Sequence, residues 1–163
     1  MAGITTKARV QLRLVATTVL SPSDILSVVR QVVGDTKKGG GVNVLNFSVL
    51  NMSARVNIAH EFPNRLALSI TSLDRRVELC SFSARVTEPD ANGKTRLQIG
   101  GLETYKTTQQ RVLMLIPVAP ASIWGYPLYK YFLDVVAAAL SQRDPSASVS
   151  IAIPSQRREG TNE

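Results

Sequence analysis

The sequence predicts an α+β fold: a curved antiparallel sheet of about six to eight strands, packed against a long C-terminal helix and a shorter N-terminal helix. Three observations lead to this fold class. Segments of alternating apolar and polar residues, the pattern of half-buried strands, run through most of the chain. Helical apolar periodicity is confined to residues 21–34 and 127–142. Strands in series with helices at the two ends favour a sheet that carries its helices on one face.

The first predicted strand is KARVQLRLVATTV. Apolar residues alternate there with basic and polar ones, so we expect Lys7, Arg9 and Arg13 to share one face of the strand. The simplest interpretation of this basic face is the solvated side of a sheet that is buried on its other side. Contact with an anion or a partner protein is the alternative.

The N-terminal helix is predicted from its start signal, SPSD. Ser21 is a good N-cap residue, Pro22 suits the first helical position, and Asp24 completes an arrangement like a capping box. The valines, leucine and isoleucine that follow fall on one side of a helical wheel, and Gly34 suits the position after the last helical residue. We therefore expect a short amphipathic helix that lies on an apolar surface.

An extended antiparallel series of five or six strands is predicted from Val42 to about Pro117. The segments EFPN, LDR and EPDANGK read as turns, and Asn92-Gly93 in the last of them supplies the positive φ that a tight connection needs. In this interpretation TTQQRVLMLIP is the strand that closes the series.

Five of the nine aromatic residues lie in IWGYPLYKYF, at the start of the C-terminal helix. Leu128, Tyr129 and Phe132 fall on the apolar stripe of that helix and are predicted core residues. Asp144-Pro145 ends the helix, and SASVSIAI alternates as a last strand. We expect one domain over residues 1–154 and a polar tail over 155–163.

The charged and reactive residues exclude several chemistries. One histidine, His60, and one cysteine, Cys80, make a metal site or a Cys/His catalytic pair a poor hypothesis, so no cofactor or metal is expected and the chain leans away from enzymes. A lone cysteine also favours a reducing compartment, the cytoplasm. The net charge is +7, and Lys37 and Lys38 join the basic strand as candidate contacts for an anion or a partner.

The order of elements resembles the helix-grip fold of the START-domain superfamily. The matching parts are KARVQLRLVATTV-SPSDILSVVRQVVG, the strands through RVLMLIP, and YPLYKYFLDVVAAALSQ; the single short helix after the first strand and the strand after the long helix depart from the pattern. The resemblance implies an apolar cavity between sheet and long helix that binds lipids, polyketides or similar ligands. The segment from GGLETYK to SASVSI also resembles small uncharacterised actinobacterial proteins, which implies no function.

Two functional hypotheses follow. The first is a non-catalytic binding domain for an apolar small molecule, with Trp124, Tyr126 and Tyr105 near the mouth of the site, because aromatic rings offer apolar contact and a polar handle. The second is a structural or interaction protein, self-assembling or not, that uses the basic sheet face or the edge of SASVSIAI. Nucleic-acid binding is a weaker hypothesis, because the basic strand has no aromatic residues for stacking on bases.

Overall fold

The computed structural model describes residues 6–38, 42–43, 53–107, 111–113, 116–119 and 122–154. Its elements in chain order are α1 (Thr6–Arg9), β1 (Arg13–Thr18), α2 (Pro22–Lys38), β2 (Val42–Asn43), β3 (Ser53–Phe62), β4 (Arg65–Ser72), β5 (Glu78–Val86), β6 (Thr95–Gly100), β7 (Thr104–Tyr105), β8 (Arg111–Leu113), β9 (Ile116–Ala119), α3 (Tyr126–Arg143) and β10 (Ser148–Ala152). The predicted fold class is confirmed: an antiparallel sheet carries an N-terminal and a C-terminal helix.

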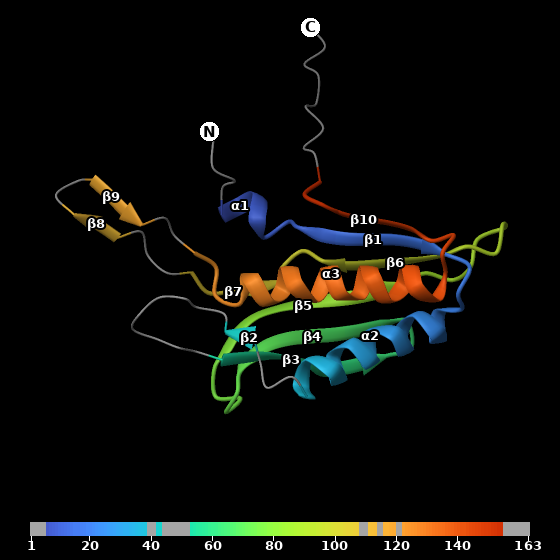
Figure 1. Ribbon diagram of the computed structural model, residues 1–163, viewed down its shortest axis with the longest axis horizontal. Helices are drawn as coiled ribbons and strands as arrows, with labels where there is room; N and C mark the ends of the chain where they lie inside the picture. The colour runs from blue at the N-terminus through green and yellow to red at the C-terminus, as the bar shows by residue number, and fades with distance from the viewer. Residues whose placement is uncertain are drawn as a thin grey trace, which may run out of the picture.

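The main sheet has eight strands, seven of them in the order β10-β1-β6-β5-β4-β3-β2. The eighth strand, β7, continues along β5 beyond the end of β6. The first strand of the chain, β1, therefore lies between β6 and the last strand, β10. Both long helices, α2 and α3, lie side by side across one face of this sheet (Figure 1). We call this the helix face and the opposite side the open face.

Alternation along the strands separates the two faces. On β1 the buried residues are Leu14, Ala16 and Thr18, whereas Arg13 and its alternating neighbours stay half-exposed on the open face. The helix face is filled by large side chains that are almost completely enclosed, among them Leu66, Leu68, Ile70, Phe82, Leu97, Ile99, Leu128, Tyr129, Phe132, Leu133, Val136 and Leu140. The predicted core residues of the C-terminal helix are thus confirmed.

Aromatic packing joins α3 to the centre of the sheet. The ring of Phe82 meets Tyr129 edge-on, with 4.8 Å between ring centroids, and lies 5.7 Å from Phe132. The hydroxyl of Tyr129 donates a 2.5 Å hydrogen bond to the carbonyl oxygen of Leu12, just before β1. Burial raises the pKa of Tyr129, so the side chain remains a neutral donor. This contact fixes the start of β1 over the first turns of α3.

The predicted strand over residues 7–19 is wrong in its first half. Residues Thr6–Arg9 form a short helical turn, in which the amide of Val10 donates to the carbonyl of Thr6. The strand begins at Arg13 because this is the first residue that pairs on both sides, with Gly100 of β6 and Ala152 of β10. The alternation of apolar and polar residues begins at Lys7, before the region in which β6 and β10 are present to pair with the chain.

Two further boundaries differ from the prediction. The N-terminal helix continues through Gly34 to Lys38, because Gly34 adopts helical geometry and the hydroxyl of Thr36 bonds back to the carbonyl of Val32. TTQQRVLMLIP does not close the sheet: β8 and β9 form a separate two-stranded hairpin that projects from the main body (Figure 1). The position beside β6 is already occupied by β1, which the sequence order alone does not reveal.

The predicted start of α2 and the predicted end of α3 are confirmed. Ser21 caps α2: the amide of Asp24 donates to its hydroxyl, and the hydroxyl donates to the Asp24 carboxylate at 2.6 Å. At the end of α3, Asp144 accepts hydrogen bonds from the Thr18 hydroxyl at 2.6 Å and the Val19 amide at 3.0 Å. Asp144 thereby ties the turn before β10 to the end of β1.

Candidate functional site

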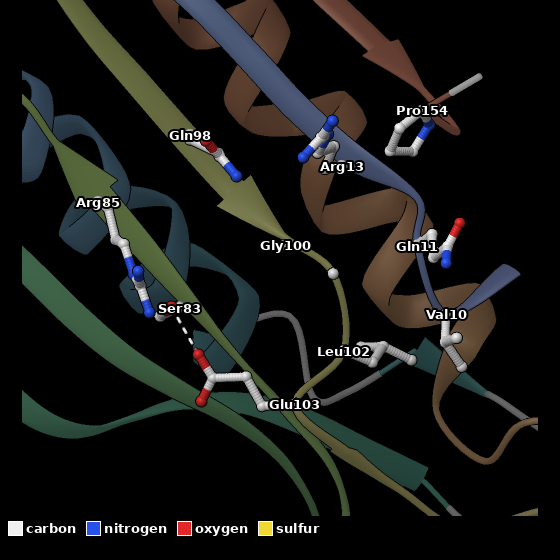
Figure 2. A pocket seen from close by; sticks show the side chains of 11 residues that line it. Val10, Gln11, Arg13, Ser83, Arg85, Gln98, Gly100, Leu102, Glu103 and Pro154 are labelled. Carbon is white, nitrogen blue, oxygen red and sulfur yellow. Dashed lines mark hydrogen bonds between the residues drawn. The ribbon is translucent and has the colours of Figure 1, made fainter. Parts of the chain in front are cut away.

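The candidate site is a hollow of about 550 Å³ on the open face of the sheet. Figure 2 shows it between β1 and β5, with Arg13 on one side, Arg85 and Ser83 on the other, and Gln98 of β6 between them. The residues that line it are Val10, Gln11, Arg13, Ser83, Arg85, Gln98, Gly100, Gly101, Leu102, Glu103 and Pro154. They come from three adjacent strands and from the segments next to α1 and β10.

A backbone irregularity after β6 creates this hollow. Ala84 of β5 pairs with Ile99, but Ser81 pairs with Thr104, so two residues of β5 lie opposite four residues, 100–103. The extra residues bulge out of the regular ladder, as β-bulges do near sites of function. The chain returns to β5 where the amide of Glu103 donates to the carbonyl of Ser81.

Contacts on the helix face require a glycine at position 100, and the absence of a side chain there leaves space on the open face. Its φ is +102°, and a Cβ at this position would lie 2.0 Å from the Tyr129 hydroxyl and 2.8 Å from the Leu12 carbonyl oxygen. Only glycine fits both the positive φ and the close approach. On the open face, this glycine leaves no side chain between Arg13, with which it is paired, and Ser83 on the far side.

Arginines of neighbouring strands face each other at the edge of the hollow. Arg65 and Arg85 are directly paired across β4 and β5, an arrangement of like charges that opposes strand pairing. Arg65 lies 3.4 Å from Glu103, whose carboxylate also accepts a 2.7 Å hydrogen bond from Ser83. Among the described residues, Arg85 has neither an ion pair nor a side-chain hydrogen bond, and the same is true of Arg13.

The two sides of the hollow differ in polarity. Arg13, Arg85 and Gln98 provide hydrogen-bond donors on the side of the strands. The Ser83 hydroxyl already donates to Glu103, whose negative charge is offset by the ion pair with Arg65. Val10, Leu102 and Pro154 provide apolar surface on the side of the chain ends. The hollow therefore offers positive charge, neutral donors and apolar surface to a single ligand.

The predicted aromatic site is only partly assembled. Trp124 and Tyr126 are both half-buried at the start of α3, and the amide of Trp124 donates to the carbonyl of Lys106. Burial raises the pKa of Tyr126, and the positive charge of Arg9 partly offsets this effect. Tyr105 is 45% exposed on β7, and no ring contact within the described residues joins it to the other two.

The predicted basic surface is divided by the fold. Arg13 lines the hollow, whereas Arg9 lies in α1, close enough to Tyr126 to influence its pKa, and Lys7 is exposed on α1. Lys37 and Lys38 belong to the last turn of α2, and their side chains lie outside what the structure describes. The helical turn at residues 6–9 removes the common strand face that the alternation predicted.

Sequence reasoning missed most of the residues of the hollow. Alternation in the sequence places Ser83, Arg85 and Gln98 on the polar face of their strands, and the structure places them on the open face, but nothing in the alternation indicates that they surround a cavity. The signal that was available is Gly100-Gly101 at the end of a strand, because paired glycines inside a strand pattern indicate a bulge or a close backbone approach.

Cys80 and His60 lie apart in the sheet. Cys80 is 1% exposed, and burial raises the pKa of its thiol to about 12, so the nucleophilic thiolate is scarce at neutral pH. His60 lies exposed on β3. Cys80 lies on β5, and β4 separates these two strands. Within the described ranges, no three His, Cys, Asp or Glu side chains are grouped so as to hold a metal ion.

No protein-family model, no curated protein and no solved structure matches the chain. The resemblance to the START-domain superfamily therefore stays a prediction. In the part of the chain that the structure describes, none of the helices combines the length and the apolar character needed to cross a bilayer.

Proposed function

We propose that the protein is a non-catalytic binding domain that holds a small amphipathic anion, such as a carboxylate on an apolar body, in the hollow of the open face. The observation that carries this proposal is the pair Arg13 and Arg85. Both line the same hollow, and neither has a counter-ion among the described residues. A bound anion would supply the missing partner for both.

The strand spacing allows one anionic group to contact both arginines. A single strand, β6, separates β1 from β5, so their backbones are about 9.5 Å apart. The long side chains of Arg13 and Arg85 can each extend toward the middle of this gap, where Gly100 leaves room and Gln98 adds a donor. Arginine also binds carboxylates through two parallel hydrogen bonds, which favours it at such sites.

The apolar side of the hollow defines the rest of the ligand. Val10 and Leu102 lie away from the arginines, whereas Pro154 lies beside Arg13, and all three offer little hydrogen bonding (Figure 2). An apolar group placed there would lose contact with water, which contributes about 25 cal/mol for each Å² that is buried. A ligand with one anionic end and an apolar body therefore fits better than inorganic phosphate or a neutral alcohol.

Thermal unfolding with decanoate, decanol and inorganic phosphate as probes tests this proposal. Ligand binding to the folded state raises the melting temperature, so decanoate is expected to raise it in a concentration-dependent manner. We expect no comparable shift with decanol or phosphate. The shift with decanoate should decrease as salt rises, because exposed charge pairs are screened.

Substitutions on the open face provide the matched controls. Arg13→Gln and Arg85→Gln should each abolish most of the shift, whereas Arg96→Gln should retain it. Arg96 is an exposed arginine of β6 that does not line the hollow. Equal shifts in all three variants, or an equal response to decanol, would contradict the proposal.

A second candidate function keeps the apolar small molecule but places it at the start of α3. The indole N–H of Trp124 is enclosed and has no hydrogen-bond partner among the described residues, which is uncommon for a buried tryptophan. The strand order also supports a helix-grip-like arrangement, because β1 lies beside the last long strand of the meander and β2 lies at the far edge. The described interior between sheet and α3 is filled, so this ligand would lie beside Trp124 and Tyr126.

Tryptophan fluorescence separates the two sites, because Trp124 is the only tryptophan in the chain. A neutral apolar probe at the start of α3 should shift the emission maximum and should do so equally in Arg85→Gln. An anion in the hollow should stabilise the protein and leave the emission unchanged. The proposed compartment for either function is the cytoplasm, where a chain with one cysteine would stay reduced.

A further inference from the structure

Strand β10 is an open edge of the main sheet. It is the last strand in the sheet order and pairs only with β1 among the described strands, from Arg13↔Ala152 to Thr17↔Ser148. In an antiparallel pair, half of the backbone N–H and C=O groups of an edge strand point away from its neighbour. Those groups of β10 are available to another strand.

Within the described residues, the β10 edge lacks the features that usually prevent strand addition. Natural edge strands are protected by charged residues, by proline, by bulges or by being very short. The five residues Ser148–Ala152 include no charge and no proline, and their pairing with β1 is regular. At the opposite edge, β2 covers only Ser53 and Ala54 of β3. The rest of β3 carries the charged residues Arg55 and Glu61 and has a register shift between Ile58 and His60, so it is protected by charge and by an irregularity. One edge of the sheet is suited to pairing, and the other is not.

The position of β10 is fixed before any partner arrives. Asp144 accepts hydrogen bonds from Thr18 and Val19 at the end of β1, and its other carboxylate oxygen accepts one from the Ser146 amide at 2.9 Å. This network holds the turn that leads into β10. A pre-ordered edge loses little conformational entropy when a second strand binds.

We propose that β10 pairs with β10 of a second copy of this chain, antiparallel and centred on Ser150, to form a continuous sheet across a two-fold dimer. In this register Ser150 lies opposite its own copy, Val149 opposite Ile151, and Ser148 opposite Ala152. Small residues meet on the open face, and β-branched residues meet on the helix face, where Val149 and Ile151 are half-buried. A two-fold interface requires such self-complementarity.

The charge of the chain predicts how this dimer responds to salt. Two copies with a net charge of +7 each repel one another, and added salt screens the repulsion. The dimer is therefore favoured as ionic strength rises. An acidic protein partner on the same edge would show the opposite dependence, so the sign of the salt effect distinguishes the two occupants.

Disulfide trapping tests the register directly. Directly opposite residues of an antiparallel pair have Cα atoms about 4.5–5.5 Å apart, which suits a disulfide. Ser150→Cys should form a covalent dimer at least tenfold faster than Ser148→Cys, because residue 148 lies opposite residue 152 and not opposite itself. A mixture of Ser148→Cys and Ala152→Cys should cross-link between the two variants. Cys80 is buried, and burial raises its pKa to about 12, so it does not compete.

Light scattering of the wild-type chain complements the trapping experiment. The mass should move from one chain toward two as concentration and salt increase, and Ser150→Lys should abolish this change by placing two like charges opposite each other at the axis. Ser150 is exposed, so the variant should fold, which circular dichroism can check. A wild-type mass of one chain under all conditions, or equal cross-linking of Ser150→Cys and Ser148→Cys, would overturn the proposal.

Discussion

The two faces of the same sheet differ in how completely their side chains are satisfied: one face is enclosed by helices, and the other carries arginines without a counter-ion in the part of the chain that the structure describes. On the helix face, residues such as Phe82 and Leu97 are fully enclosed by α2, α3 and neighbouring strands. On the open face of the same sheet, Arg13 of β1 and Arg85 of β5 line a hollow without a counter-ion among the described residues. Burial of apolar area is the main source of folding stability. We therefore expect stability to depend on the helix face and binding to depend on the open face.

The strongest test of this comparison is Phe82→Ala on the helix face. Phe82 is 0% exposed and contacts the rings of Tyr129 and Phe132, so its removal leaves a cavity in the centre of the core. We expect a loss of about 3–5 kcal/mol in the free energy of unfolding, measured by urea denaturation. A loss below about 1 kcal/mol would mean that the helix face is less tightly packed than described.

Gly100→Ala tests the point where the two faces meet. The substitution introduces strain at a φ of +102° and a clash with the Tyr129 hydroxyl. We expect the variant to lose about 1–3 kcal/mol of stability and to bind decanoate less well, because the bulge that forms the hollow must shift. Tyr129→Phe in the same background removes the clashing oxygen. A double-mutant cycle should therefore show that the two substitutions are not additive.

Acid unfolding tests the polar contacts that join α3 to β1. Hydrogen bonds from Ser146, Thr18 and Val19 lower the pKa of Asp144 well below its usual range. Because the folded-state pKa lies below the unfolded value of about 4, its contribution is complete above that value and is lost as the pH falls below it.

Asp144→Asn should therefore be less stable than the wild type at pH 7 and should approach it toward pH 2. Unfolding midpoints measured across this range provide the comparison. Asp134→Asn removes the same charge from an exposed site on α3 and serves as the control. If both variants respond to pH alike, Asp144 does not stabilise the fold through its ionised form.

The smallest expected effect is a gain in stability, whereas the substitutions above reduce it. Arg85→Ala removes one of two like charges that are paired across β4 and β5, so we expect a gain of about 0.2–1 kcal/mol in stability at low salt. The gain should decrease as salt screens the repulsion. A clear loss of stability would show that Arg85 has a structural partner and would weaken its role in binding.

Local patterns in the sequence were sufficient for the elements with strong signals. The capping residues Ser21 and Asp24 set the start of α2, the apolar stripe through Leu128 and Phe132 gave the inner side of α3, and SASVSIAI gave β10. These predictions hold because each depends on residues that are close together in the sequence. The strand predicted over residues 7–12 failed because its alternation has no neighbouring strand on both sides until Arg13.

The sequence by itself determined which residues face water and which face the core, because a period of two assigns alternate side chains of a strand to opposite faces. Only the tertiary structure decided that Arg13, Arg85 and Gln98 surround one hollow. Their neighbourhood depends on the pairing of β1 with β6 and β5, and on a bulge whose glycine must accommodate Tyr129 from a helix that follows later in the chain. Contacts between residues so distant in sequence leave no local pattern from which they can be predicted.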